Sequence, residues 1–70
     1  MFDYSKLKGR IKEICGTQDE FANRVGIGRV SLSKRLNNQL EFSQAEMLAT
    51  AKVLNFNENE ITEYFFNEIV

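Results

Sequence analysis

The side chains of this chain best suited to chemistry are the Arg, Lys and Ser residues gathered from Arg29 to Arg35. Arginine and lysine donate hydrogen bonds that fit phosphate oxygens and the acceptor edge of guanine, and serine hydroxyls can bond to bases or phosphates. No Asp or Glu occurs from Phe21 to Leu40, so no acid in this window offsets the cations. The stretch could bind a polyanion, and the alternative is that it forms an ordinary solvated helix surface.

The composition argues against an enzyme. The chain has no His and one Cys, Cys15, so Ser-His and Cys-His pairs and the usual metal sites cannot be assembled. A carboxylate pair needs a concave pocket, and a chain of 70 residues has little material for one. We therefore expect no catalysis and no cofactor. With no leader-like segment or long apolar run, we expect a cytoplasmic protein without a disulfide or membrane contact.

The elements that position the cationic stretch read as helices. There is no proline, Val and Thr are few, and no apolar–polar alternation marks a strand. The first helix is predicted from a stripe with helical spacing that ends at Gly16, comprising Leu7, Ile11, Ile14 and Cys15. Thr17 and Glu20 form a capping box that starts a second helix at Gln18, and Gly26 can close it with a positive φ.

A third helix is predicted from Arg29 to Leu36, with Gly28 as its N-cap. Leu32 and Leu36 lie one turn apart and face inward, which turns Val30 and Lys34 outward. Residues 37–42 lack a helical period and read as a loop.

Two further caps predict two further helices. Ser43 with Glu46 opens a fourth helix that stops near Asn55, with apolar positions at Met47, Leu48, Ala51 and Leu54. Asn57 with Glu60 opens the last helix, whose apolar positions are Ile61, Tyr64, Phe65, Phe66 and Ile69. The prediction is an all-α fold of five helices in one domain spanning residues 1–70.

The middle of the chain resembles a known family. Residues 17–38, TQDEFANRVGIGRVSLSKRLNN, are similar to the helix-turn-helix of the phage lambda Cro/CI repressors, and SQAEMLATAKVLNFNENEI is similar to the helices that follow. The resemblance covers about residues 5–66 and depends on Gln18, Ala22, Gly26, Leu32 and Asn37. It implies a compact lambda-repressor-like DNA-binding domain whose third helix enters the major groove of an operator.

Geometry and this resemblance together give candidate DNA contacts. Base contacts are expected from Gln18, Arg29, Val30, Ser31 and Lys34. Phosphate contacts are expected from Gly28, Ser33, Arg35, Asn37, Asn38 and Gln39, with turn formation as an equal alternative for the last three. Three residues depart from the family pattern: Arg35 replaces an apolar residue, Asn38 a common glycine and Phe42 a common proline. Arg35 could instead lay its stem along the core edge.

The two halves of the chain carry opposite charge. Residues 1–40 hold eight Lys and Arg against four Asp and Glu, a net charge of +4, and residues 41–70 hold one Lys against six Glu, a net charge of −5. The first hypothesis is a small Cro-like repressor that binds double-stranded operator DNA. A homodimer could form through the apolar excess of the final segment, which comprises Tyr64, Phe65, Phe66, Ile69 and Val70, unless these residues all complete the core.

The second hypothesis is a protein-interaction module. In this case the chain is an anti-repressor that binds another phage or host regulator through its acidic C-terminal half.

Overall fold

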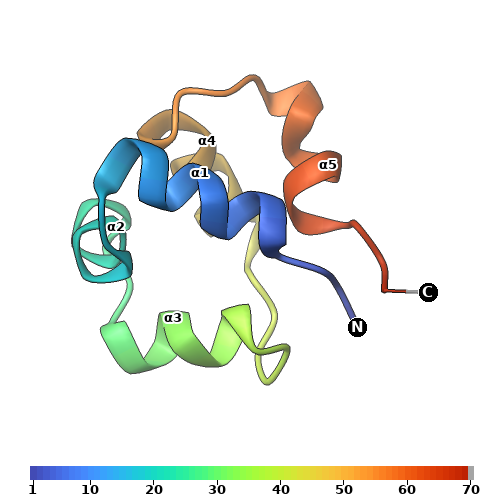
Figure 1. Ribbon diagram of the computed structural model, residues 1–70, viewed down its shortest axis with the longest axis horizontal. Helices are drawn as coiled ribbons and strands as arrows, with labels where there is room; N and C mark the ends of the chain where they lie inside the picture. The colour runs from blue at the N-terminus through green and yellow to red at the C-terminus, as the bar shows by residue number, and fades with distance from the viewer. Residues whose placement is uncertain (70) are drawn as a thin grey trace.

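The structure is a computed structural model that describes residues 1–69, and these form helices joined by short connections (Figure 1). The helices are α1 (Ser5–Cys15), α2 (Gln18–Val25), α3 (Arg29–Leu36), α4 (Gln44–Val53) and α5 (Ile61–Phe65), with a 3₁₀ turn, η1 (Glu58–Glu60), leading into α5. The predicted all-α fold with five helices is confirmed, and α3 begins and ends where the sequence indicates. No helix among the described residues is long and apolar enough to cross a membrane.

Capping side chains start the helices largely as expected. At α4 the Ser43 hydroxyl accepts from the Glu46 N–H at 3.1 Å, and the Glu46 carboxylate accepts from the Ser43 N–H at 2.8 Å. A similar box of Asn57 and Glu60 opens η1. At α2 half of the predicted box forms: the Thr17 hydroxyl accepts from the Glu20 N–H, but the Glu20 carboxylate pairs with an arginine instead of reaching back.

Four residues among 1–69 have a positive φ, Gly16, Gly26, Asn38 and Asn55, and two of them lie in the connections beside α3. Gly26 ends α2 at a φ of 87°, where a side chain would be strained. Asn38, after α3, adopts a φ of 62° without being glycine, which agrees with the tolerance of Asn for this region. These two residues fix how α3 leaves the bundle and how the chain returns to α4.

The core lies between α1, α2, α4 and α5, with α3 packed on α2 (Figure 1). Its largest fully buried apolar side chains are Phe21, Phe65, Leu7, Ile11, Leu32 and Leu54. Two predicted core positions, Ile14 and Leu48, are exposed instead. Thr50 of α4 is a buried polar residue. Its hydroxyl donates to the Glu46 carbonyl at 2.7 Å, so the buried polar group has a hydrogen-bond partner.

The C-terminal segment differs from the prediction. The last helix ends at Phe65, and the chain runs back beside the N-terminus, where Phe2 and Glu68 form an antiparallel bridge (Figure 1). The Asp3 N–H donates to the Asn67 carbonyl at 2.7 Å. Pairing with residues 1–3 supplies backbone hydrogen bonds that a longer helix would otherwise have made internally. Ile69 therefore lies outside α5, and Val70 lies outside the described residues.

Candidate functional site

Helix α3 presents the predicted outward face to solvent. Val30 is 68% exposed, which is high for an apolar side chain, and Lys34 lies exposed one turn further along the helix. Arg29 begins α3 directly after Gly28, its extended N-cap. The inward positions Leu32 and Leu36 are buried, so the helix is anchored as its spacing indicates.

Acidic residues of α2 neutralise the cations beside this face. The Arg29 guanidinium Nε lies 3.0 Å from an Asp19 carboxylate oxygen, with side chains 80% and 60% exposed. Within α2, Arg24 pairs with Glu20 at 2.9 Å. Both acids lie in the first turn of α2, where the helix dipole favours negative charge. The place where a helix N-terminus could accept a phosphate is thus lined by the protein's own carboxylates.

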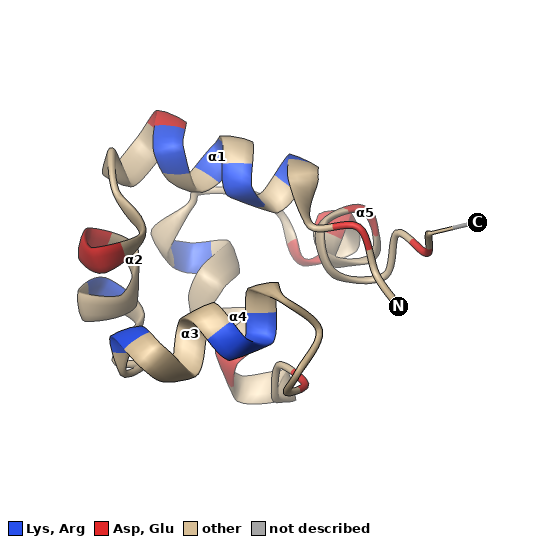
Figure 2. Ribbon diagram, turned by 60° about the horizontal axis from the view of Figure 1, so that its bottom comes forward, with Lys and Arg blue, Asp and Glu red and all other residues tan. Residues whose placement is uncertain are grey.

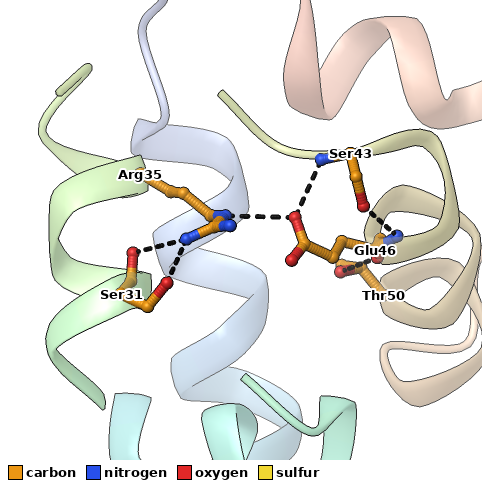
Figure 3. A network of polar contacts seen from close by, with 5 residues as sticks. All are labelled: Ser31, Arg35, Ser43, Glu46 and Thr50. Carbon is orange, nitrogen blue, oxygen red and sulfur yellow. Dashed lines mark hydrogen bonds and ion pairs between the residues drawn. The ribbon is translucent and has the colours of Figure 1, made fainter. Parts of the chain in front are cut away.

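Arg35 lies inside a polar network that joins α3 to α4, and is not a free phosphate ligand (Figure 3). Its Nε donates to Glu46 Oε1 at 3.0 Å, and its Nη1 donates to the Ser31 carbonyl at 3.0 Å and to the Ser31 hydroxyl. The side chains of Arg35 and Glu46 are only 16% and 22% exposed. The structure therefore differs from the expected phosphate contact of Arg35, and the expected base contact of Ser31 competes with this internal bond.

Glu46 serves the N-cap of α4 and the Arg35 pair with one carboxylate oxygen. Burial acts to raise the pKa of Glu46, but the Ser43 N–H and the Arg35 guanidinium favour the charged form and hold the pKa below its ordinary value of 4.5. The network therefore holds Glu46 charged near neutral pH and ties α3 to α4.

The loop after α3 uses its amides within the protein. Asn38 donates from Nδ2 to the Phe2 carbonyl at 3.0 Å and accepts at Oδ1 from the Phe2 N–H at 2.9 Å. Asn37 donates from Nδ2 to the Ser33 carbonyl at 2.9 Å, closing the end of α3. Both Asn side chains therefore take part in turn formation, the alternative that the sequence left open, and their expected phosphate contacts stay predictions.

The remaining predicted contact residues are exposed. These are Gln18 at the start of α2, Gly28 before α3, Ser33 on α3 and Gln39 in the following loop. Their expected contacts with DNA stay predictions.

The predicted pairing surface divides into a buried and an exposed part. Tyr64 and Phe65 are 8% and 1% exposed, so the structure differs from their expected place in a dimer interface. Tyr64 stacks on Phe56 with ring centroids 4.2 Å apart, and the Lys6 ammonium lies 4.9 Å from the Tyr64 ring centroid. Phe66 and Ile69 remain exposed and available to a partner.

An apolar groove lies where the chain ends meet the loop after α3. It has a volume of about 660 Å³ and is lined by Met1, Phe2, Tyr4, Asn38, Gln39, Leu40, Glu41, Phe42, Met47, Phe65 and Phe66. Sequence reasoning missed the groove because its residues come from four separate segments. The available signal was the pair of large apolar residues Leu40 and Phe42 in a stretch without helical period.

Charge around the groove is acidic. Glu41 lines the groove. The backbone of Glu68 forms the antiparallel bridge with that of Phe2, which is a lining residue. Burial raises the pKa of the Tyr4 hydroxyl, and the nearby Glu41 carboxylate raises it further. Figure 2 shows acidic positions around α5 and the C-terminal stretch, and basic positions along α1 and α3. The charge split of the sequence is therefore partly a split in space, with the acids of the first turn of α2 as an exception on the basic side.

Comparison with known proteins gives a family and a related structure. The chain is similar to the solution structure of the modulator of repression (MOR) of the temperate bacteriophage TP901-1 from Lactococcus lactis. The two are 41% identical, the match covers 94% of this chain and 89% of the other, and the TM-score is 0.82. No curated protein sequence matches the chain. The family whose pattern matches, over residues 1–68, is described as a protein of unknown function (DUF739) and not as Cro/CI repressors. The chain belongs to the DUF739 family.

Proposed function

We propose that this chain is a phage regulatory protein, without enzymatic activity, that modulates repression by binding another regulator. In this role it contacts that regulator through its acidic C-terminal half. This is the second of the two hypotheses that the sequence leaves open.

The observation that carries the proposal is the likeness to the modulator of repression of phage TP901-1. An identity of 41% over 94% of the chain, with a TM-score of 0.82, supports a shared mode of action as well as a shared fold. The name of that protein describes action on repression, which fits a protein that works on a repressor.

The charges on the molecule agree with a basic protein partner. DNA-binding surfaces of regulators are positively charged, and the C-terminal half of this chain carries a net charge of −5. Complementary charge speeds association and favours the correct partner. A protein with this surface is suited to compete with DNA for a repressor.

Direct DNA binding through α3 is the second candidate. It is favoured by the exposed Val30 and Lys34 on a helix anchored from behind by Leu32. Against it stand the Arg29–Asp19 pair, the inward Arg35 and the acids at the start of α2. Two of the three cations predicted to contact DNA from α3 are thus engaged by carboxylates.

The two candidates are separated by fluorescence anisotropy of a labelled operator duplex. The duplex is titrated with this chain alone, with the repressor encoded by the same phage or prophage genome, and with both proteins. We expect no specific complex with the chain alone at moderate salt, and a change in repressor occupancy when the chain is added. Specific binding by the chain alone, with a slope of log K against log salt of about −4 to −5 per protomer, supports the DNA-binding candidate.

A further inference from the structure

We propose that the groove between the chain termini and residues 38–42 is the docking site for a cationic amphipathic segment of the partner. The segment inserts apolar side chains into the groove and places Lys or Arg beside Glu41 and Glu68. This inference rests on the proposed function and identifies the surface and the chemistry of the partner.

The floor of the groove is a connected set of aromatic rings. Phe2 meets Phe66 edge-on at a centroid distance of 5.6 Å, and Tyr4 meets Phe42 edge-on at 5.6 Å. Phe42 in turn contacts Phe65 at 4.9 Å. Since these contacts tie the floor to the buried core, the site is preformed and little side-chain freedom is lost when a partner binds.

The rim of the groove exposes apolar surface to water. Leu40 is 45% exposed, Phe66 is 46% exposed, and Met1 is the most exposed large apolar side chain among the described residues. Ile69 is exposed nearby, with its N–H bonded to the Met1 carbonyl at 3.1 Å. Apolar residues gathered in one place in this way are typical of an interaction site, in contrast to singly scattered ones.

The charges select a cationic occupant. Within residues 1–69, Glu41 has the one side chain lining the groove that is charged near neutral pH. No Lys or Arg side chain lines the groove there. Glu68 does not line the groove, but its backbone bridges to that of the lining residue Phe2 and its side chain is exposed, which puts a second carboxylate near this edge. A Lys or Arg on the partner can pair with these carboxylates and can also lie over the exposed aromatic rings.

A second copy of this chain fits the groove less well. A two-fold dimer through this surface places the same patch on both sides of the interface. Glu41 and Glu68 of both copies are then brought into one interface without added cations from Lys or Arg of the lining, and gathering like charges in this way is unfavourable. A phosphate backbone meets the same repulsion.

A second hollow in the protein supplies matched controls. It has a volume of about 620 Å³ and is lined by Leu48, Ala51, Lys52, Asn55, Phe56, Asn57 and Glu58. Leu48 is 40% exposed, close to the value for Leu40, and Glu58 is exposed as Glu41 is. Leu40→Ser and Glu41→Lys therefore test the groove, and Leu48→Ser and Glu58→Lys control for loss of apolar surface and reversal of charge.

The experiment measures binding of two labelled peptides to the full chain by fluorescence anisotropy. One is an amphipathic helical peptide of about 14 residues made of Lys, Leu and Ala, and the other carries Glu in place of each Lys. We expect the Lys peptide to bind at least about 10-fold more tightly than the Glu peptide. Leu40→Ser and Glu41→Lys are each expected to weaken the Lys peptide at least about 5-fold, and the two controls less than about 2-fold. Circular dichroism verifies that all four variants are folded.

Several outcomes overturn the inference: no binding of the Lys peptide at millimolar concentration, equal binding of both peptides, or equal losses in groove and control variants. Sedimentation that shows a dimer disrupted by Leu40→Ser assigns the groove to a second copy and also overturns it. The anisotropy titration with the repressor and the operator duplex, described under the proposed function and repeated with the groove variants, distinguishes this failure from that of the proposed function. Repressor binding that persists in Leu40→Ser and Glu41→Lys contradicts the groove alone. Absence of repressor binding by the unmodified chain contradicts the proposed function, while the peptide arm still decides the groove.

Discussion

The outer face of α3 and the groove beside the chain termini are both exposed, but they leave different charges available to a partner. On the α3 side, Arg29 is paired with Asp19 and Arg35 is held by Glu46. In the groove, Glu41 lies among mostly apolar and aromatic side chains, and no Lys or Arg side chain lines it within residues 1–69. The Arg35–Glu46 pair uses one charge from each half, and Glu63 of the acidic half pairs with Lys6, so the contrast between the two surfaces rests on Glu41, which forms no ion pair within residues 1–69. The comparison indicates a basic partner for the acidic half.

The largest expected effect comes from reversing charges on the two surfaces. Glu41→Lys combined with Glu68→Lys is expected to weaken binding of the repressor about 50-fold, because both changes place cations against a basic partner. Arg29→Glu combined with Lys34→Glu is expected to change it less than about 3-fold. Isothermal titration calorimetry measures both variants. A larger loss of repressor affinity in the α3 variant than in the groove variant would contradict the assignment of partner binding to the acidic half.

A second prediction separates the two arginines of α3 by their role in stability. Arg35→Met removes one partner of a half-buried pair and leaves Glu46 without its cation, which is expected to lower the free energy of unfolding by about 2 kcal/mol. Arg29→Met breaks an exposed pair and is expected to cost less than about 0.5 kcal/mol. Urea unfolding followed by circular dichroism tests this difference. Equal losses contradict the assignment of Arg35 to the interior.

The third prediction concerns the pH dependence of the same network. Because the pKa of Glu46 is held below 4.5 in the folded protein, the stability that Glu46 contributes is present above that value and is lost as the pH falls through the folded pKa. Glu46→Gln is expected to be about 1 kcal/mol less stable at pH 7. The difference from the unmodified protein should shrink below about pH 4. A difference that stays constant from pH 7 to pH 3 contradicts this role of the carboxylate.

The fold could largely be predicted from the sequence because its signals are local. The boxes at Ser43 and Asn57 and the glycine at residue 26 mark helix ends through contacts within a few residues. The spacing of Leu32 and Leu36 likewise fixes the orientation of α3. Such features depend on helix geometry alone.

What the sequence could not provide depends on contacts between distant segments. The apolar positions from Ile61 to Ile69 predict one continuous helix, but pairing of the chain ends removes Phe66 and Ile69 from α5. The partners of Arg29 and Arg35 lie on other helices, so the acid-free window from Phe21 to Leu40 gave no sign that Asp19 and Glu46 would pair with them. The groove was missed for the same reason, since it joins residues more than 60 positions apart.

The smallest expected effect is a gain of DNA affinity when the acids of α2 are removed. Asp19→Asn with Glu20→Gln frees Arg29 and Arg24 from their pairs. We expect a rise of about 3- to 10-fold in non-specific DNA affinity at low salt, with a steeper salt dependence. Anisotropy with a labelled duplex of unrelated sequence measures it, and an unchanged affinity contradicts the view that these acids offset the cations of α3.

The central claim is that this protein recognises another protein through its acidic half. It is tested most directly by the ¹⁵N–¹H NMR spectrum of the full chain, recorded with the DNA-binding domain of the repressor and, separately, with operator DNA. We predict that the repressor domain shifts the signals of Phe2, residues 39–42 and residues 66–69, and that DNA at moderate salt leaves the spectrum unchanged. Shifts produced by DNA and centred on Arg29, Val30 and Lys34, with none produced by the repressor domain, would contradict the account.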